Sequence, residues 1–254
     1  SIALTVLLLS GLPIAFAFAL AAAVGLWWED LPMLSMASKM FAGLDSFVLL
    51  AAPFYIVAGE VMSRGGISDR LIQLSTLLIG RVRGGSAYAA VIAAVLFSGI
   101  SGTAVADIAA LGQIFINAMP KEGYSKPFSA ALITAASIIG PIIPPSVIMV
   151  IYAGFAGVSV VKMFMAGIVP GLLMGASLAV VVFIYGLRGG LPESRPVIPR
   201  AEVPRVIGDG LVVMSLPAVI LGGSVSGVFT PTEAGGIACV YALLLGFFWY
   251  RDLR

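Results

Sequence analysis

The sequence predicts an all-helical integral membrane protein that contains a re-entrant helical hairpin and a broken helix. Its 254 residues are 60% hydrophobic and only 10% charged, with a mean hydropathy of +1.11. A soluble domain carries roughly 25% charged residues, so this chain cannot cover a surface that faces water. The apolar stretches are long and do not alternate with polar residues, which favours membrane helices over the strands of a membrane barrel.

The composition also argues against several kinds of chemistry. The net charge of +2 is small, and no Lys/Arg cluster with interleaved aromatic residues indicates a nucleic-acid partner. Histidine is absent from the sequence, which removes the commonest general base and metal ligand. The single cysteine, Cys239, lies in an apolar run and is interpreted as a packed residue. Without a nucleophile–base pair or a metal-ligand spacing, we expect neither an enzyme nor a cofactor.

The N-terminal part predicts a membrane span followed by interfacial segments. Ile2–Trp28 is apolar and is predicted to cross the membrane, with two tryptophans at its end as interfacial anchors. Glu29–Leu44 is mixed in character and is expected to lie at the interface. Asp45 is expected to cap a helix that continues through Phe47–Met62. Arg64–Arg83 is basic and amphipathic, which predicts a helix on the membrane surface.

The next apolar segment is interrupted and predicts the re-entrant hairpin. Ser86–Phe97 and Ala104–Ala118 are apolar, and Ser98–Thr103 separates them. Each half holds about a dozen residues, whereas a helix that crosses the hydrocarbon core needs about 20. Glycine permits a tight turn at the tip. A bilayer tolerates such a break mainly where the backbone is buried in protein or lines a hydrated site.

The tip of this hairpin is a candidate site for a cation. Turned backbone presents carbonyl oxygens there, and Ser98, Ser101 and Thr103 add hydroxyl oxygens, a ligand set that suits a hard cation such as sodium. The second arm begins near Thr103, so its positive N-terminus can also face an anionic substrate. The alternative is that these small residues only let helices pack closely.

Asp107 lies one turn into the second arm of the hairpin, in an otherwise apolar stretch. A carboxylate at this depth is costly and therefore indicates a function. It could neutralise sodium, carry a proton, or fix the hairpin through hydrogen bonds to the tip. The structural alternative is a carboxylate in the first helical turn that the helix dipole stabilises.

Phe128–Ile139 and Ser146–Phe155 predict two half-helices on either side of a second break. Three prolines within Gly140–Ser146 remove hydrogen-bond donors and block continuation of the helix. The carbonyls of Ser137–Gly140 are expected to lose their usual partners and to become available to a cation, while Ser146 opens the next half-helix. The alternative is a plain loop between helices, against which the short flanking segments argue.

Three further spans are predicted in the C-terminal part. Met163–Leu187 forms the first, started by Ser159, and Leu211–Val228 and Pro231–Tyr250 form the others. Between them, Arg188–Asp209 is polar and proline-rich and is expected to be a cytoplasmic linker.

Two acidic residues in polar motifs are interpreted as structural. Thr230, Pro231 and Glu233 have the pattern of a helix capping box, which explains them without a ligand. Glu60 lies near a predicted helix end that precedes basic residues, and is interpreted in the same way.

The basic residues favour one orientation in the membrane. If Arg64–Arg83 is cytoplasmic, then Lys121–Lys126, Arg188–Arg205 and the tail Arg251–Arg254 also fall inside. These four stretches hold four, two, four and two basic residues, so twelve of the fourteen Lys and Arg residues are inside. This orientation places both chain ends in the cytoplasm and makes the hairpin enter from the cytoplasmic face.

Taken together, these motifs resemble the large membrane subunit of the tripartite ATP-independent periplasmic (TRAP) transporters. The matching stretches run in family order across the chain: Phe47–Gly66, Ser98–Asp107, Gly123–Tyr124, Ile139–Ser146, Ala166–Gly171 and Phe229–Ala234. Together they are specific, whereas any one of them alone is weak.

The resemblance implies a sodium-coupled importer of an organic acid anion, such as a dicarboxylate or sialic acid, in the bacterial inner membrane. It implies that a periplasmic substrate-binding protein delivers the anion and that a small four-helix membrane subunit, within membrane lipid, completes the complex. The implied fold is of the elevator type, in which a transport domain with hairpins and broken helices moves against a scaffold. Such a fold has two inverted repeats, of which only the first is expected in this sequence.

The resemblance also implies residue roles. It places sodium at Ser98, Gly99, Ser101, Gly102, Thr103, Gly140, Ile143 and Pro144. It places the substrate beside Thr103, Asp107 and Ser146. We accordingly divide the chain into scaffold helices with an amphipathic arm (1–85), the hairpin and broken helix of the transport domain (86–158), and further membrane helices with the linker 188–209 (159–254).

The family pattern continues beyond Arg254, where this sequence stops. A second hairpin and a second broken helix are expected to lie outside it, through truncation, which we favour, or on a separate chain. Three other functions stay open at this point. They are a sodium/anion symporter that needs no binding protein, a channel subunit, and a non-transporting membrane scaffold in which the two breaks serve packing alone.

Overall fold

The computed structural model describes residues 2–193 and 198–250. The described residues form helices and turns and contain no strand, which confirms the prediction of an all-helical protein. They fall into two units, Ser1–Ser46 and Phe47–Arg254. Residues 194–197 of the expected linker and the tail Arg251–Arg254 lie outside the described residues.

The first unit contains α1 (Ile2–Leu9), α2 (Ile14–Trp28) and α3 (Leu34–Leu44). The prediction of one continuous span over the first two of these helices is therefore wrong. Gly11 adopts a positive φ of 79°, and Pro13 then stands at the N-cap of α2. Proline disfavours helical conformation at the residue before it, so a helix cannot pass smoothly through this turn.

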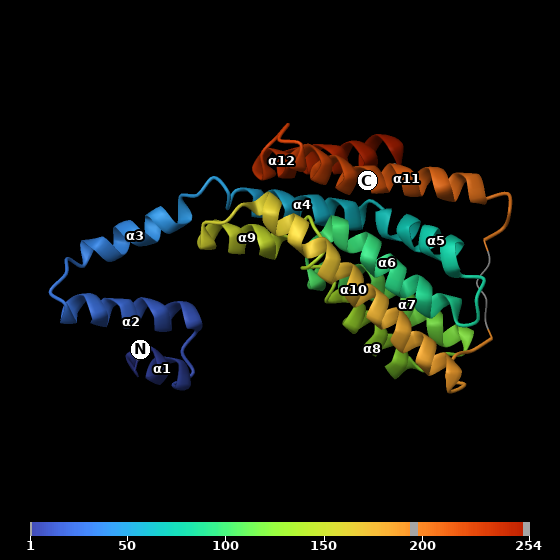
Figure 1. Cartoon of the computed structure of the whole chain (residues 1–254), viewed down its shortest axis with the longest axis horizontal. Helices are drawn as coiled ribbons and strands as arrows, with labels where there is room; N and C mark the ends of the chain where they lie inside the picture. The colour runs from blue at the N-terminus through green and yellow to red at the C-terminus, as the bar shows by residue number, and fades with distance from the viewer. Residues whose placement is uncertain (1, 194–197, 251–254) are drawn as a thin grey trace. The chain divides into compact units, whose positions relative to one another are not determined.

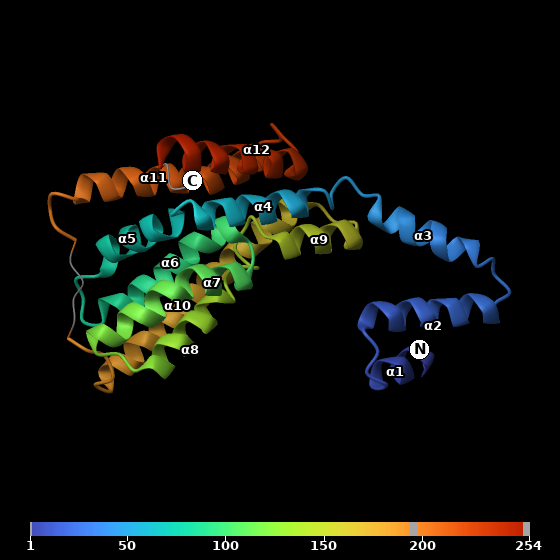
Figure 2. The ribbon, with the colours of Figure 1, turned by 180° about the vertical axis from the view of Figure 1, so that it is seen from behind.

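The second unit contains the remaining helices. They are α4 (Ala51–Arg64), α5 (Ile67–Ile79), α6 (Gly85–Ser101), α7 (Ala104–Ala118), η1 (Met119–Glu122), α8 (Lys126–Ser137), α9 (Val147–Ala156), α10 (Val160–Leu187), α11 (Val203–Val225), α12 (Pro231–Leu244) and η2 (Leu245–Trp249). Within this unit α11 and α12 pair on one side, α4 and α5 follow each other next to them, and α6, α7, α8 and α10 form the other side (Figure 1). The reverse view shows the same order of layers (Figure 2).

Among the described residues, three helices are long and apolar enough to cross a membrane: Val160–Leu187, Val203–Val225 and Pro231–Phe248. They correspond to the three C-terminal spans that the sequence predicted. Ser159 caps the first of them, because its Oγ accepts the Lys162 N–H at 3.4 Å. The second begins at Val203, within the expected linker, so the linker is shorter than predicted.

The start of α4 differs from the prediction. Asp45 does not cap this helix; it follows the last turn of α3, where its N–H donates to the Phe41 carbonyl at 2.9 Å. The helix begins only at Ala51. By contrast, the amphipathic segment after α4 does form a helix, α5, with Leu71 fully buried and Leu78 63% exposed.

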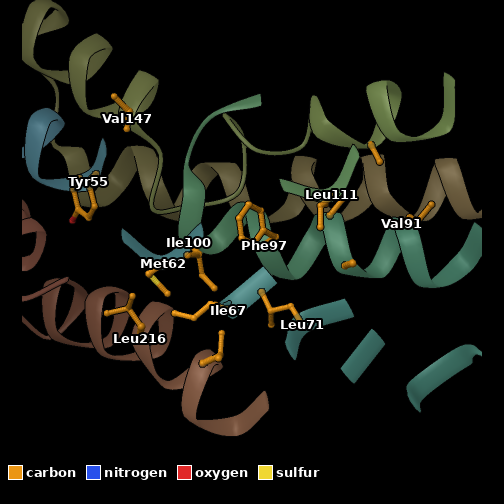
Figure 3. Packing of buried hydrophobic residues seen from close by; sticks show 14 of the residues in the cluster. Tyr55, Met62, Ile67, Leu71, Val91, Phe97, Ile100, Leu111, Val147 and Leu216 are labelled. Carbon is orange, nitrogen blue, oxygen red and sulfur yellow. The ribbon is translucent and has the colours of Figure 1, made fainter. Parts of the chain in front are cut away.

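The core of the second unit surrounds α6 (Figure 3). Phe97 and Ile100 of α6 are buried together with Met62 of α4, Leu111 of α7 and Leu216 of α11. Close packing of this kind between apolar helices is the main force that holds helices together in a bilayer. It fixes the C-terminal end of α6, where the candidate site lies.

Residues that the sequence analysis interpreted as structural have structural partners. Glu233 accepts the Thr230 N–H at 2.7 Å while Thr230 Oγ1 accepts the Glu233 N–H at 3.3 Å, which confirms the capping box. Glu60 pairs with Arg64 at 2.6 Å on the exposed surface of α4. The Cys239 thiol is half-buried and donates to the Phe54 carbonyl at 2.9 Å.

Candidate ion and substrate site

The turn at the tip of the hairpin is shorter than the sequence predicted. Helix α6 continues through Ser98 to Ser101, and only Gly102 and Thr103 separate it from α7. Gly102 has a left-handed φ of 60°, and its N–H donates to the Ser98 carbonyl at 3.2 Å, which closes α6. Thr103 Oγ1 accepts the Ala106 N–H at 3.3 Å, which opens α7. The predicted break is therefore confirmed only in its last two residues.

The proline loop separates α8 from α9, as predicted. Ser146 caps α9, because its Oγ accepts the Met149 N–H at 3.3 Å. The same hydroxyl donates to the Pro141 carbonyl at 2.7 Å, which ties the end of the loop to its beginning. Ser146 thus has the position that the sequence analysis gave it, at the opening of the second half-helix.

The carbonyls at the end of α8 do not all lose their backbone partners. The Ser137 carbonyl accepts the Gly140 N–H at 3.1 Å, and the Ile139 carbonyl accepts the Ile142 N–H at 2.9 Å. The Ile139 carbonyl also accepts the Ile143 N–H at 3.0 Å, so it keeps its usual helical partner and the expectation is wrong for this residue. Ser137 does lose its usual partner, because residue 141 is a proline, and the Gly140 N–H takes its place. A carbonyl oxygen has two lone pairs, so the Ser137 carbonyl can still accept a second partner.

The tip of the hairpin and the proline loop lie against each other. A Cβ placed on Gly102 would stand 2.8 Å from the Pro145 carbonyl oxygen and 3.1 Å from the Val147 nitrogen. A Cβ on Gly140 would stand 2.5 Å from Asp107 Oδ2. Only glycine permits such close approaches of backbone. The structure therefore brings together the two segments that the sequence predicted as one site.

Four helix termini meet at this contact. Helices α6 and α8 end there, whereas α7 and α9 begin there. The carbonyls at a helix C-terminus carry a partial negative charge, and the N–H groups at an N-terminus carry a partial positive charge. The arrangement therefore offers a favourable place for a cation directly beside one for an anion.

Asp107 is buried at this contact, with 0% of its surface exposed. The Ser101 hydroxyl donates to its Oδ1. Its Oδ2 lies against Gly140 and has no hydrogen-bond partner among the described residues. A buried carboxylate with so few partners is strongly disfavoured unless a proton or a cation joins it. The site therefore calls for a positive partner at this oxygen.

Among the other predicted sodium ligands, the side chains of Ser98 and Ile143 have partners elsewhere, whereas the Pro144 carbonyl faces the hairpin. Ser98 Oγ donates to the Val95 carbonyl at 2.8 Å, one turn back on its own helix. The side chain of Ile143 packs directly against Gly171 of α10, where a Cβ would overlap it, so this side chain is engaged in packing. The Pro144 carbonyl oxygen, 3.6 Å from a Cβ on Gly99, does face the hairpin. A hydroxyl that donates its proton keeps oxygen lone pairs, so Ser98 still qualifies as a ligand.

Three residues that pack around the site were not among the predicted site residues. Gly59 of α4 lies against the tip: a Cβ placed on Gly59 would stand 3.3 Å from the Ser101 carbonyl oxygen. Gly167 of α10 lies against the Ile142 carbonyl, and Pro217 of α11 touches Gly99. The spacing of Gly167 and Gly171 along one helix was a usable signal for close packing. The Pro217 contact has no local signal, because it joins segments far apart in the sequence.

A second polar cluster, also not predicted, lies between α5, α11 and Tyr250, the residue that follows η2. The Arg70 guanidinium carbon stands 3.7 Å from the centroid of the Tyr250 ring, and Arg70 Nε lies 4.0 Å from Asp209 Oδ2. The Tyr250 hydroxyl donates to the Asp209 carbonyl at 3.2 Å. Burial raises the pKa of Tyr250 to about 12, so this hydroxyl keeps its proton at neutral pH. The cluster joins α5 and α11 to Tyr250 and has the character of a structural clasp.

These features define a helical membrane protein whose buried polar site lies where a hairpin meets a broken helix. The chain belongs to the family described as the tripartite ATP-independent periplasmic transporter, DctM component, whose profile matches residues 1–254.

Relatives with curated names support this membership. The chain is 41% identical over 244 residues to the 2,3-diketo-L-gulonate TRAP transporter large permease protein YiaN of Escherichia coli (strain K12), covering 96% of this chain and 57% of that one. It is 39% identical over 249 residues to the C4-dicarboxylate TRAP transporter large permease protein DctM of Vibrio cholerae, covering 97% of this chain and 55% of that one. It is 36% identical over 249 residues to the sialic acid TRAP transporter large permease protein SiaM of the same species, covering 97% of this chain and 58% of that one. The chain thus spans little more than half the length of these relatives.

Proposed function

We propose that this chain forms the part of a TRAP large permease that binds a coupling sodium ion and borders the path of an organic acid anion. The observation that carries the proposal is the meeting of four helix termini around the buried carboxylate of Asp107. The three relatives described above are named for diketogulonate, C4-dicarboxylates and sialic acid, all of which carry carboxylates.

Sodium would bind between the hairpin tip and the proline loop. The atoms that could coordinate sodium there are oxygens. They are the carbonyl oxygens of the tip and of the loop, and the hydroxyl oxygens of Ser98, Ser101 and Thr103. Oxygen ligands suit a hard cation. Its charge would compensate the Oδ2 oxygen of Asp107, which has no hydrogen-bond partner among the described residues.

The anion would lie beside the N-termini of α7 and α9, which begin after Thr103 and Ser146. Their N–H groups favour negative charge, and bound sodium adds to this attraction. Because sodium and the anion each favour the presence of the other, the affinity for one rises when the other is bound. This reciprocity is the physical basis of coupled transport.

We further propose an elevator motion of the hairpin and broken helix against the scaffold helices, in the bacterial inner membrane. A periplasmic binding protein would deliver the anion, and a small membrane subunit would complete the permease. These steps depend on the full-length permease and are proposed for it.

The test is uptake of labelled succinate, sialic acid and diketogulonate into proteoliposomes that hold the full-length permease and its small subunit. Wild type is compared with Ser101→Ala and Asp107→Asn, with and without sodium and binding protein. Loss of a hydrogen bond to a buried charged group predicts a fall in uptake of about tenfold or more. Ser177→Ala is the matched control, because Ser177 is exposed on α10 and its hydroxyl donates to the Met174 carbonyl of the same helix.

Each outcome discriminates between functions. The proposal is supported if uptake requires sodium and binding protein, and if it falls in both site variants but not in the Ser177→Ala control. Uptake without binding protein favours a simple symporter. Uptake that survives in both site variants places the sodium site elsewhere, and conduction without saturation favours a channel.

A further inference from the structure

We propose that an anionic phospholipid of the bilayer occupies a groove between α6 and α10, with an acyl chain along the groove and its phosphate at Arg83. This inference goes beyond the proposed function and does not depend on sodium coupling. It rests on the shape of two adjoining cavities and on the charge at one end of them.

The first cavity, of about 260 Å³, lies between the middle of α6 and α10. Val91 and Val95 of α6 form one wall, and Leu172, Ala176 and Ala179 of α10 form the other. All of these side chains are apolar, so in a bilayer the cavity would be filled by hydrocarbon and not by water.

The second cavity, of about 470 Å³, continues toward the end of α10. Phe183 and Leu187 of α10 line it together with Val82 and Tyr88. Ile79 and Tyr88 line both cavities, so the two form one groove. Arg83 is the charged residue in its lining, and its side chain is exposed at the groove's mouth.

The groove is long enough to extend through one leaflet of a bilayer and into its headgroup region. Its α10 wall runs from Leu172 to Leu187, which at the helical rise corresponds to about 22 Å. The hydrocarbon core is about 30 Å thick, so one leaflet contributes about half of that. A groove of this length can therefore take an acyl chain while its charged mouth lies at the headgroup level.

The mouth of the groove is positively charged. The turn between α5 and α6 meets the end of α10 there, as the contacts of Leu191 with Gly84 and Gly186 establish. Both views show these chain segments at the same end of the second unit (Figures 1 and 2). Arg83 lies in the lining of the groove, Arg81 belongs to the same turn, and Arg188 directly follows α10. The carboxylates tied to these segments are Glu193, which follows Leu191, and Glu122, which contacts Ser86 at the start of α6.

These charges favour an anionic lipid as the occupant. The three arginines attract an anionic headgroup, and one of the two carboxylates, Glu122, already accepts a hydrogen bond from Ser86. Arginine and lysine near the surface bind anionic lipids, and tyrosine favours the membrane interface, where Tyr88 would lie.

The test is native mass spectrometry of the full-length permease with its small subunit, in micelles that contain equal amounts of phosphatidylglycerol and phosphatidylethanolamine. We expect wild type to retain phosphatidylglycerol preferentially. Arg83→Gln should lower this retention about fivefold, in line with the contribution of one basic residue near a membrane. Lys162→Gln is the matched control, because Lys162 is exposed at the start of α10, at the opposite end of the helix from the groove's mouth, and is not part of the lining.

A steric pair of variants tests the groove itself. Ala176→Trp fills the first cavity and should abolish retention of the lipid. Val181→Trp should leave it unchanged, because Val181 is exposed on another face of α10 and lines neither cavity. Equal retention of both lipids in wild type, or unchanged retention in Arg83→Gln, would overturn the proposal. A crosslink between Ala176→Cys and the small subunit would also overturn it, because a protein helix would then occupy the groove.

Discussion

The carboxylate of Asp107 lies directly against the backbone of Gly140. A Cβ at residue 140 would stand 2.5 Å from Asp107 Oδ2 and 3.1 Å from the backbone carbonyl carbon of Thr103. This contact joins the second arm of the hairpin to the start of the proline loop. It leaves the buried oxygen no room for a larger neighbour, so the pair is both a packing contact and the centre of the candidate site.

Gly140→Ala should destabilise the protein. The added methyl group overlaps a buried carboxylate that Ser101 holds in place, and overpacking of this kind costs about 1–3 kcal/mol. The measurement is the free energy of unfolding in mixed micelles. Gly222→Ala is the control, because nothing lies within 4 Å of that position on α11. Equal stability of Gly140→Ala and wild type would contradict the contact.

Sodium should stabilise the wild type but not Asp107→Asn. An ion that binds only the folded state adds about 2.7 kcal/mol at a concentration one hundred times its Kd. Asparagine has nearly the same shape but no charge to compensate. Unfolding is measured in sodium chloride and in potassium chloride at equal ionic strength. A sodium-dependent increase of the same size in both proteins would exclude Asp107 from the ion site.

Gly102→Ala should cost more than Gly157→Ala. Both glycines have left-handed φ angles, 60° and 66°, so each substitution carries a similar conformational penalty of about 1–2 kcal/mol. Only Gly102 is also enclosed, by the Pro145 carbonyl and Val147, whereas nothing lies within 4 Å of Gly157. The difference in unfolding free energy therefore measures how tightly the tip packs on the loop. Equal losses would mean that the tip is not held there.

Arg70 and Tyr250 should be energetically coupled. A double-mutant cycle with Arg70→Gln and Tyr250→Leu is expected to give a coupling free energy of about 0.5–2 kcal/mol, as for a partly desolvated cation–π pair. Arg205 also approaches Asp209, at 3.7 Å, but its side chain is 81% exposed. Arg205→Gln should therefore change stability by less than about 1 kcal/mol. Additive effects of the first two substitutions would show that the stacked geometry contributes nothing.

Local sequence patterns predicted the parts of the site that depend on backbone chemistry. Gly102 and the prolines of the loop impose their conformations regardless of the surroundings, so both breaks were found. Thr103 and Ser146 were expected where helices begin, and both cap a helix. The end of α6 was missed, because Gly59 packs on Ser101 and Pro217 packs on Gly99, and these contacts favour a helical tip despite the weak helix propensity of serine and glycine.

Two other features were missed for different reasons. The apolar composition of the first 28 residues hid the turn at Gly11 and Pro13, although proline is a reliable sign of a helix start. The clasp of Arg70, Asp209 and Tyr250 joins residues that are far apart in the sequence, so no spacing pattern pointed to it. Contacts of this second kind depend on tertiary structure alone.

The contact between Gly59 and the Ser101 carbonyl limits how the hairpin can slide along α4. The neighbouring turns of α4 on the same buried face carry Tyr55 and Met62. A shift of one helical turn would push one of these large side chains into the backbone of the tip. Gly59 therefore fixes the position along α4 at which the tip of the hairpin can pack. Any larger displacement of the hairpin must carry α4 with it or first separate the two.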